Sequence, residues 1–321
     1  MQETLNIGID VAKSELVIDV ADHAELNGSI GNTAAHIRRW LEHVPAGSRL
    51  AVESTGRYHK QLVELAQEKG VLTYVLNARD VLFYVKALGQ RGKTDRTDAQ
   101  AISCYVKEHH SRLHTFCPGG QVEQQIDQLL SRRVLLSTQL DALRRSLGDL
   151  PGLDERIEAL LKEYERLITA IDDHIALQIR SDEQLALESK RLQTVPGIGA
   201  QGAAMLLCLF RRIPFKGMDA LIAFTGLDPR PNDSGQKRGK RKLSKRGPAL
   251  LRRQIFMMGF AASKSKTCGS YYQALRARGF SSTAAFIMLG RKLLRTAFAV
   301  WRSQKSFDAE QFALNTPCAK L

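Results

Sequence analysis

Four carboxylates near the start of the chain have the types and spacing for metal-dependent phosphate chemistry. Asp10 ends one short apolar run and Glu53 ends another. Asp95 and Asp98 are three residues apart, so they share one face of a helix. Acids gathered in one place repel each other unless cations fill the site, and oxygen ligands favour Mg²⁺ or Mn²⁺. Taken singly, each acid is more simply a turn former, a helix-start residue or a surface acid, so only the set of four predicts a metal site.

One serine in a basic segment is the candidate nucleophile. Between Gly235 and Gly247, Ser244 is the only hydroxyl. It is accompanied by seven cations that could bind nucleic acid, namely Lys237, Arg238, Lys240, Arg241, Lys242, Lys245 and Arg246. Cations beside a serine attract a phosphate and stabilise the charge that develops on it, although the hydroxyl still needs activation. From these residues alone, a serine in a phosphate-binding loop is the simpler interpretation.

The elements that must position the acids are three strands followed by alternating helices and strands. The predicted strands are Leu5–Val11, Leu16–Val20, Leu26–Ile30, Leu50–Val52 and Val71–Leu76, and the predicted helices lie at about 33–44, 59–69, 80–88 and 95–108. This order predicts an α/β domain with a mixed sheet, and it is the order of the ribonuclease-H-like fold. In that fold the first and fourth strands are neighbours and a late helix crosses their tips. The four acids would then converge.

Residues 121–190 have a different pattern. Apolar residues recur at alternating spacings of three and four, with Arg133 in the one polar slot, and Leu150–Leu153 interrupts the pattern. This predicts two amphipathic helices that form a helical hairpin or a coiled coil. A helical bundle packed on its own domain is the alternative.

A glycine-containing turn opens the last part of the chain. Thr194–Gly199 resembles the turn of a helix-hairpin-helix, in which backbone N–H groups near Gly197 and Gly199 hold a DNA phosphate. A tight packing turn without a ligand fits the residues equally well.

The charge of the chain is unevenly distributed. The net charge is +14, and residues 191–321 contain 24 Lys and Arg against 5 Asp and Glu. This excess predicts a polyanion partner for the C-terminal part, because bound phosphates release counterions. The five cysteines form no CxxC pair, and no apolar run approaches the roughly 18 residues of a membrane span. We therefore expect a cytoplasmic protein with no membrane partner.

Six motifs in order carry a family resemblance. They are Gly8–Lys13, Glu53–Tyr58, Lys93–Ala99, Val195–Gly199, Ala223–Pro229 and Leu243–Gly247. Together they resemble the DEDD-type insertion-sequence transposases, the family of RNA-guided bridge recombinases and Piv-type DNA invertases. Each motif alone is weak, and the specificity lies in the complete set.

The resemblance implies three domains: a RuvC-like nuclease domain at 1–120, a coiled-coil arm at 121–190, and a mainly α-helical basic transposase domain at 191–321. It implies that the four acids bind Mg²⁺ or Mn²⁺ and that Ser244 forms a covalent 5′-phosphoserine with DNA. The implied partners are donor and target DNA, a structured noncoding guide RNA, and further copies of the chain as dimers and tetramers. A prokaryotic, nucleoid-associated location follows.

Three alternatives remain open from the sequence. A Piv-like invertase would use the same residues, whereas a RuvC-like junction resolvase would use metal-activated water and would not need Ser244. A non-catalytic nucleic-acid-binding protein would need neither. The sequence also leaves open the DNA sites, the guide RNA, the number of subunits, and whether the acids and Ser244 of one active site come from the same subunit.

Overall fold

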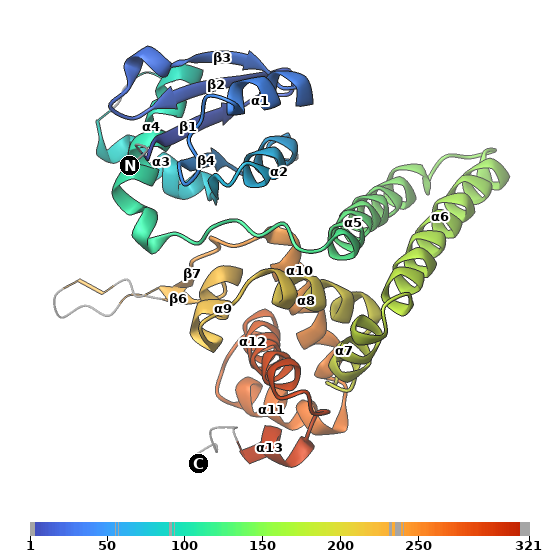
Figure 1. Ribbon diagram of the computed structural model, residues 1–321. Helices are drawn as coiled ribbons and strands as arrows, with labels where there is room; N and C mark the ends of the chain where they lie inside the picture. The colour runs from blue at the N-terminus through green and yellow to red at the C-terminus, as the bar shows by residue number, and fades with distance from the viewer. Residues whose placement is uncertain are drawn as a thin grey trace. The chain divides into compact units, whose positions relative to one another are not determined.

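The chain divides into two compact units in the computed structural model. They are Met1–Pro118 and Gly119–Leu321, and each is described by itself (Figure 1). The structure describes residues 4–314 except 55, 57, 90, 91, 93, 231, 232, 235–238 and 240.

The first unit is built on a five-stranded mixed sheet. Its strands are β1 (Asn6–Val11), β2 (Glu15–Val20), β3 (Gly28–Gly31), β4 (Arg49–Glu53) and β5 (Leu72–Leu76), in the order β3-β2-β1-β4-β5. β1 pairs antiparallel with β2 and parallel with β4. The prediction of an α/β fold with a mixed sheet is confirmed. The third strand begins two residues later than predicted, because a 3-10 turn, η1 (Ala24–Leu26), occupies the residues before it.

Helices cover both faces of this sheet. They are α1 (Ala34–Leu41), α2 (Lys60–Glu68), α3 (Ala78–Ala87) and α4 (Asp95–His109), with a short 3-10 turn, η2 (His110–Arg112), after the last. Successive strand residues point to opposite faces. Ile7 and Ile9 are fully buried in the core formed with α1 and α2. Ala51 belongs to the core formed with α3 and α4, which lies on the other face.

Helix α4 lies directly on β1 at a glycine. A Cβ atom added to Gly8 would lie 2.2 Å from the backbone nitrogen of Ser103 and 2.3 Å from the backbone oxygen of Ala99. Both neighbours are backbone atoms of α4, so they cannot rotate away. Only glycine allows the helix to approach the strand this closely.

We expect Gly8→Ala to lower the free energy of unfolding by about 1–3 kcal/mol or more, because α4 must move away from the sheet. Urea denaturation of the full chain would measure the change. Gly28→Ala is the matched control, since a Cβ at that strand residue meets nothing within 4 Å. Equal effects of the two substitutions would show that the close approach at Gly8 does not matter for stability.

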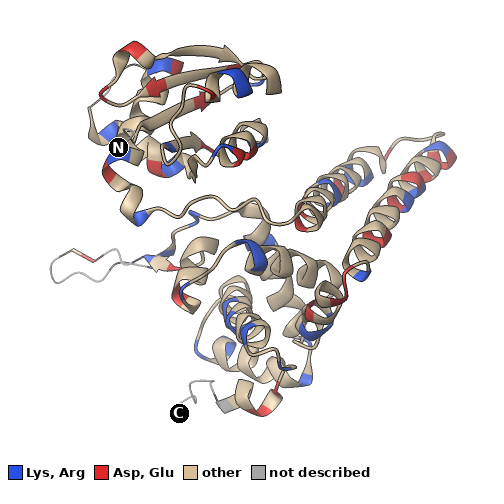
Figure 2. Ribbon diagram, in the orientation of Figure 1, with Lys and Arg blue, Asp and Glu red and all other residues tan. Residues whose placement is uncertain are grey.

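The second unit is almost entirely helical. Its elements are α5 (Gln121–Leu147), α6 (Asp154–Arg180), α7 (Glu183–Gln193), α8 (Ala200–Arg212), α9 (Met218–Thr225), β6 (Pro229–Arg230), β7 (Lys242–Leu243), α10 (Ala249–Ala262), α11 (Lys266–Ala277), α12 (Ser282–Ser303) and α13 (Ala309–Leu314). One apolar core includes buried apolar residues from α7, α8, α9, α10 and α12. Figure 2 shows acidic and basic residues along α6, whereas α12 carries only Lys and Arg among its charged residues.

The predicted helical hairpin is present as α5 and α6, each of 27 residues. Arg133, in the polar slot of the apolar pattern, forms a bidentate pair with Asp172 of α6, with N–O distances of 2.7 and 3.0 Å. Ile126 and Ile175 at the base of the hairpin belong to the core of the second unit. Residues 121–190 and 191–321 therefore share one compact unit, and a coiled coil stays a prediction. Among the described residues, no helix is long and apolar enough to cross a membrane.

Candidate active site

Asp10 and Glu53 end neighbouring parallel strands. The register of β1 and β4 pairs Ile9 with Val52, so the two acids are the next residues along the two strands. Asp10 has the same orientation as Gly8, two residues earlier, and Glu53 has the same orientation as Ala51. Gly8 and Ala51 both face α4. Both carboxylates therefore lie on the α4 face of the sheet, at the edge formed by the carboxyl ends of these parallel strands.

Helix α4 runs antiparallel to β1. Ser103 packs against Gly8, as described above. Farther along the helix, the Lys107 ammonium lies 2.5 Å from the Asp22 carboxylate. Asp22 follows the end of β2, and that end lies beside the start of β1. The N-terminus of α4 therefore points toward the end of β1, where Asp10 lies.

Asp95 and Asp98 are on the first turns of α4. Asp98 precedes Ser103 by five residues, about 7 Å along a helix. Asp10 follows Gly8 by two residues, also about 7 Å along a strand. Asp98 thus reaches the level of Asp10, and Asp95 lies one turn farther on. β1, β4 and α4 bring all four predicted acids to the same edge and the same face of the sheet.

Two threonines fix where α4 begins. The Thr94 hydroxyl accepts a hydrogen bond from the Thr97 backbone N–H at 3.2 Å, and the Thr97 hydroxyl accepts one from the Thr94 backbone N–H at 2.9 Å. This is a capping box with threonine at both positions. Because the threonines cap the helix, this role does not fall to Asp95 or Asp98.

The side chains do not close around a common point. Asp10, Glu53 and Asp98 are partly buried and Asp95 is exposed. Within the described part of the chain, no three His, Cys, Asp or Glu side chains are placed as ligands of one metal ion. The donor chemistry, carboxylate oxygens alone, suits Mg²⁺ or Mn²⁺. Metal binding at the four acids stays a prediction, and it requires these side chains to turn toward each other.

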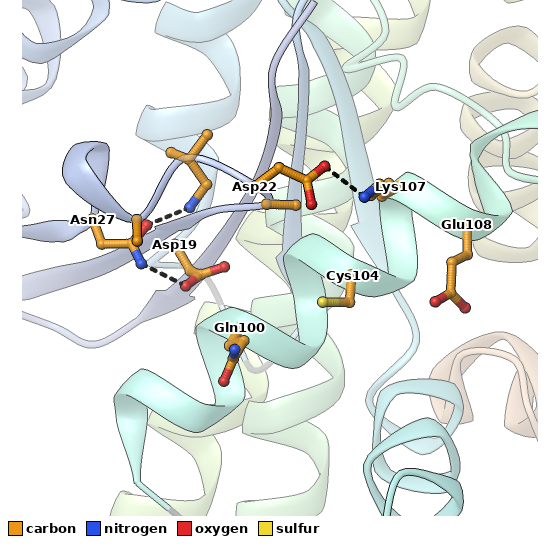
Figure 3. Close-up of a pocket in the computed structure, with 10 residues that line it drawn as sticks. Asp19, Asp22, Asn27, Gln100, Cys104, Lys107 and Glu108 are labelled. Atoms are coloured by element: carbon orange, nitrogen blue, oxygen red, sulfur yellow. Dashed lines mark hydrogen bonds and ion pairs between the residues drawn. The ribbon is translucent and has the colours of Figure 1, made fainter.

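A separate hollow of about 410 Å³ lies toward the other end of α4 (Figure 3). Asp19 in its wall is 7% exposed and accepts hydrogen bonds from the Ser103 hydroxyl and the Asn27 amide. Its carboxylate therefore ties β2 to α4 and to the loop before β3. The sequence reasoning missed this buried acid, although a charge inside the apolar run of β2 was a signal for it.

Ser244 in the second unit follows β7, which pairs antiparallel with β6. Its backbone N–H donates to the backbone oxygen of Asp228 at 3.0 Å, and its hydroxyl donates to the Asp228 carboxylate. Ser244 is only 6% exposed, whereas Lys245 and Arg246 beside it are exposed. The serine is therefore largely covered, whereas the cations that follow it are on the surface.

A tight backbone arrangement holds the serine turn. Lys245 has a φ of 53°, an unusual value for a residue with a side chain. A Cβ added to Gly247 would lie 2.0 Å from the backbone oxygen of Phe224, so only glycine fits there. The Arg252 guanidinium of α10 donates to the backbone oxygens of Gly247 and Thr225. The motifs 223–229 and 243–247 therefore form one packed structure, and Asp228 is a neighbour of Ser244 to which the sequence assigned no role.

Only some of the cations predicted to bind nucleic acid belong to the described residues. Lys237, Arg238 and Lys240 lie outside the described residues. The other four cations, Arg241, Lys242, Lys245 and Arg246, are exposed. The Arg241 guanidinium lies 3.4 Å from the Asp233 carboxylate, an exposed ion pair that a phosphate could replace.

The glycines of the α7–α8 turn have different surroundings. Gly197 has a φ of 83°, and a Cβ there would lie 2.5 Å from the backbone oxygen of Met258 in α10. Close packing thus explains the glycine at 197. Gly199 is the N-cap residue of α8, and a Cβ there would meet nothing within 4 Å. A phosphate contact at this turn stays a prediction.

Comparison with known families matches both units. Residues 7–150, which include the four acids, match a transposase model of the DEDD type from IS110 elements. Residues 189–273, which include Ser244 and Asp228, match the model described as the transposase IS116/IS110/IS902 family. The chain belongs to the DEDD-type insertion-sequence transposases. The predicted family is confirmed, and membership implies DNA transposase or recombinase activity.

Individual transposases and invertases are similar over much of the chain. The pilin gene-inverting protein of Moraxella bovis is 25% identical, and the match covers 94% of this chain and 97% of that protein. The transposase for insertion sequence element IS1111A of Coxiella burnetii is 29% identical over 57% of each chain. The transposase for insertion sequence element IS1328 of Yersinia enterocolitica is 28% identical over 54% of this chain.

Proposed function

We propose that this transposase cleaves and exchanges DNA strands through a covalent 5′-phosphoserine at Ser244. A divalent cation held by Asp10, Glu53, Asp95 and Asp98 assists the reaction. The main support is that β1, β4 and α4 bring these acids to one edge of the sheet, within the part of the chain that matches the DEDD model. The strand order and the packing of α4 on β1 also favour a RuvC-like, ribonuclease-H-like domain.

The residues of the chain have distinct roles in this proposal. Bound Mg²⁺ would stabilise negative charge on the reacting phosphate. The Ser244 oxygen forms a bond to phosphorus while the bond from phosphorus to the 3′ oxygen breaks. The exposed Lys245 and Arg246 attract the phosphate. Energy of the cleaved bond is kept in the phosphoserine, so the strand can be rejoined to a new 3′-hydroxyl.

The partners follow from the same proposal. Donor and target DNA are the substrates, and residues 191–321 have the positive charge to bind them. A structured guide RNA, and assembly of dimers into tetramers, are part of the proposal by family resemblance.

DNA inversion is the second candidate function. The pilin gene-inverting protein matches nearly the whole of this chain, whereas the IS1111A transposase matches 57% of it. Inversion and transposition both need strand cleavage and rejoining, so the same residues would serve either outcome. The arrangement of the two DNA sites would decide between them.

The proposal predicts a covalent protein–DNA adduct that depends on a divalent cation. The protein is incubated with DNA carrying the ends of its element and a transcript of the flanking noncoding region, then run on a denaturing gel. We expect the adduct with Mg²⁺ or Mn²⁺, its loss with a chelator, and its return when excess Mg²⁺ is added. DNA cleavage with no adduct would instead support a resolvase that uses water, and an undiminished adduct in the chelator would exclude the metal.

A further inference from the structure

The Ser244 hydroxyl is directed at one carboxylate. It donates a hydrogen bond to Oδ1 of Asp228, and the Ser244 backbone N–H is bonded to the Asp228 backbone oxygen at 3.0 Å. The two bonds, one from the side chain and one from the backbone, fix the direction of the hydroxyl. Asp228 immediately precedes β6 and Ser244 immediately follows β7, so the pairing of these strands holds the two residues side by side.

Other acids near this turn have different partners. The Asp233 carboxylate pairs with Arg241 at 3.4 Å, and the Asp219 carboxylate pairs with Arg295 at 2.5 Å. Lys245 and Arg246, which follow the serine, carry positive charge and cannot accept a proton. The Ser244 hydroxyl, in contrast, donates to Asp228.

The charge of Asp228 acts on Arg291 of α12. Burial and the nearby Arg295 lower the pKa of Arg291, whereas the negative charge of Asp228 acts in the opposite direction. The Arg291 Nε atom is buried and has no hydrogen-bond partner among the described residues. Asp228 thus has the serine hydroxyl as a donor, and its negative charge acts on Arg291 of α12.

We infer that Asp228 is the general base that accepts the Ser244 hydroxyl proton. The inference rests on the proposed role of Ser244 as nucleophile. In cleavage, the proton moves from the hydroxyl to Asp228 Oδ1, the oxygen forms its bond to phosphorus, and the 3′ oxygen leaves with the electron pair of the broken bond and takes a proton from water. In rejoining, a 3′-hydroxyl attacks the phosphoserine, its proton passes to water, and Asp228 returns its own proton to the serine oxygen.

Asp228→Asn removes the base and keeps an oxygen that can accept the serine hydrogen bond. General bases contribute about 10²- to 10⁴-fold, so we expect the initial rate of adduct formation to fall at least about 100-fold, with DNA binding unchanged. Asp233→Asn is the control, since that acid lies just before the basic segment and its carboxylate pairs with Arg241. A rate within threefold of the unmodified protein in Asp228→Asn would overturn the inference.

A second pair of variants excludes a packing role. Asp228→Glu and Asp228→Gln have side chains of the same length, and only Glu can accept the proton. If Asp228 is the base, the adduct should form faster in Asp228→Glu than in Asp228→Gln, even if both variants are slower than the unmodified protein. If Asp228 only packs against the serine turn, the Glu and Gln variants should form the adduct at equal rates. That result would overturn the inference even if Asp228→Asn failed to fold.

Failure of this inference can be distinguished from failure of the proposed function. If the unmodified protein forms no adduct, or if Ser244→Ala forms it normally, the proposed nucleophile is wrong and the inference falls with it. If the adduct requires Ser244 and is unaffected by Asp228→Asn, Ser244 remains the nucleophile and only the role of Asp228 is wrong.

Discussion

Replacement of Ser244 by alanine is expected to abolish the covalent protein–DNA adduct. The substitution removes the oxygen that would bond to phosphorus, and loss of a serine nucleophile lowers rates by about 10³-fold or more in serine hydrolases. The exposed cations beside it, Lys245 and Arg246, are unchanged. DNA binding should therefore be retained, so that a gel-shift assay gives a complex while a denaturing gel gives no adduct.

The buried position of Ser244 requires a control for folding. Alanine leaves the Asp228 carboxylate without its serine donor, at a cost of about 1–3 kcal/mol. A melting curve would show whether the variant is folded. Ser234→Ala, at an exposed serine just before the basic segment, should form the adduct normally. An adduct of normal yield in Ser244→Ala would remove Ser244 as the nucleophile and favour hydrolysis by water.

Replacement of Asp10 by asparagine is expected to stop recombination without loss of the fold. Asp10 and Glu53 end adjacent strands on the same face of the sheet. Loss of a metal-binding carboxylate removes several kcal/mol of charge stabilisation. The recombination rate should therefore fall by at least about 100-fold. Like charges on neighbouring strands destabilise a sheet, so the melting temperature should be unchanged or higher. A recombination assay beside a melting curve measures both effects.

Asp22→Asn is the matched control for this substitution. Asp22 is an acid of the same unit whose carboxylate pairs with Lys107 on α4 at the exposed surface. Its backbone φ of 68° is one that asparagine tolerates well. Normal recombination by Asp22→Asn and none by Asp10→Asn would assign the loss to the predicted metal site. Recombination by Asp10→Asn at the normal rate would show that the acid is structural.

The sequence was sufficient to predict the first unit because its patterns are local. The β-branched and aliphatic residues of β1, and the helical spacing in α1 and α2, are patterns of residues a few positions apart. The convergence of the acids required one further step, the adjacency of the first and fourth strands. That step came from the order of the elements, and the pairing of β1 with β4 confirms it.

Contacts between distant residues could not be predicted in the same way. The bond between Ser244 and Asp228 depends on the register of β6 and β7, which no local pattern specifies. Arg133 was recognised as a polar residue in an apolar pattern, but its partner Asp172 depends on how α5 and α6 are aligned. Gly197 was left between two interpretations, because its neighbour Met258 belongs to a helix some sixty residues later.

The contact of α4 with Gly8 requires an even number of residues from Gly8 to the acid, because successive strand residues point to opposite faces. A single residue inserted between Gly8 and Asp10 would turn the carboxylate into the apolar layer of α1 and α2, where an unpaired charge is strongly unfavourable. Two inserted residues would restore the face and carry the acid about 7 Å past the edge, beyond the level of Asp98. Only a spacing of two residues puts the acid both on the α4 face of the sheet and at the level of Asp98. The interval from Gly8 to Asp10 therefore determines where the carboxylate lies in the site.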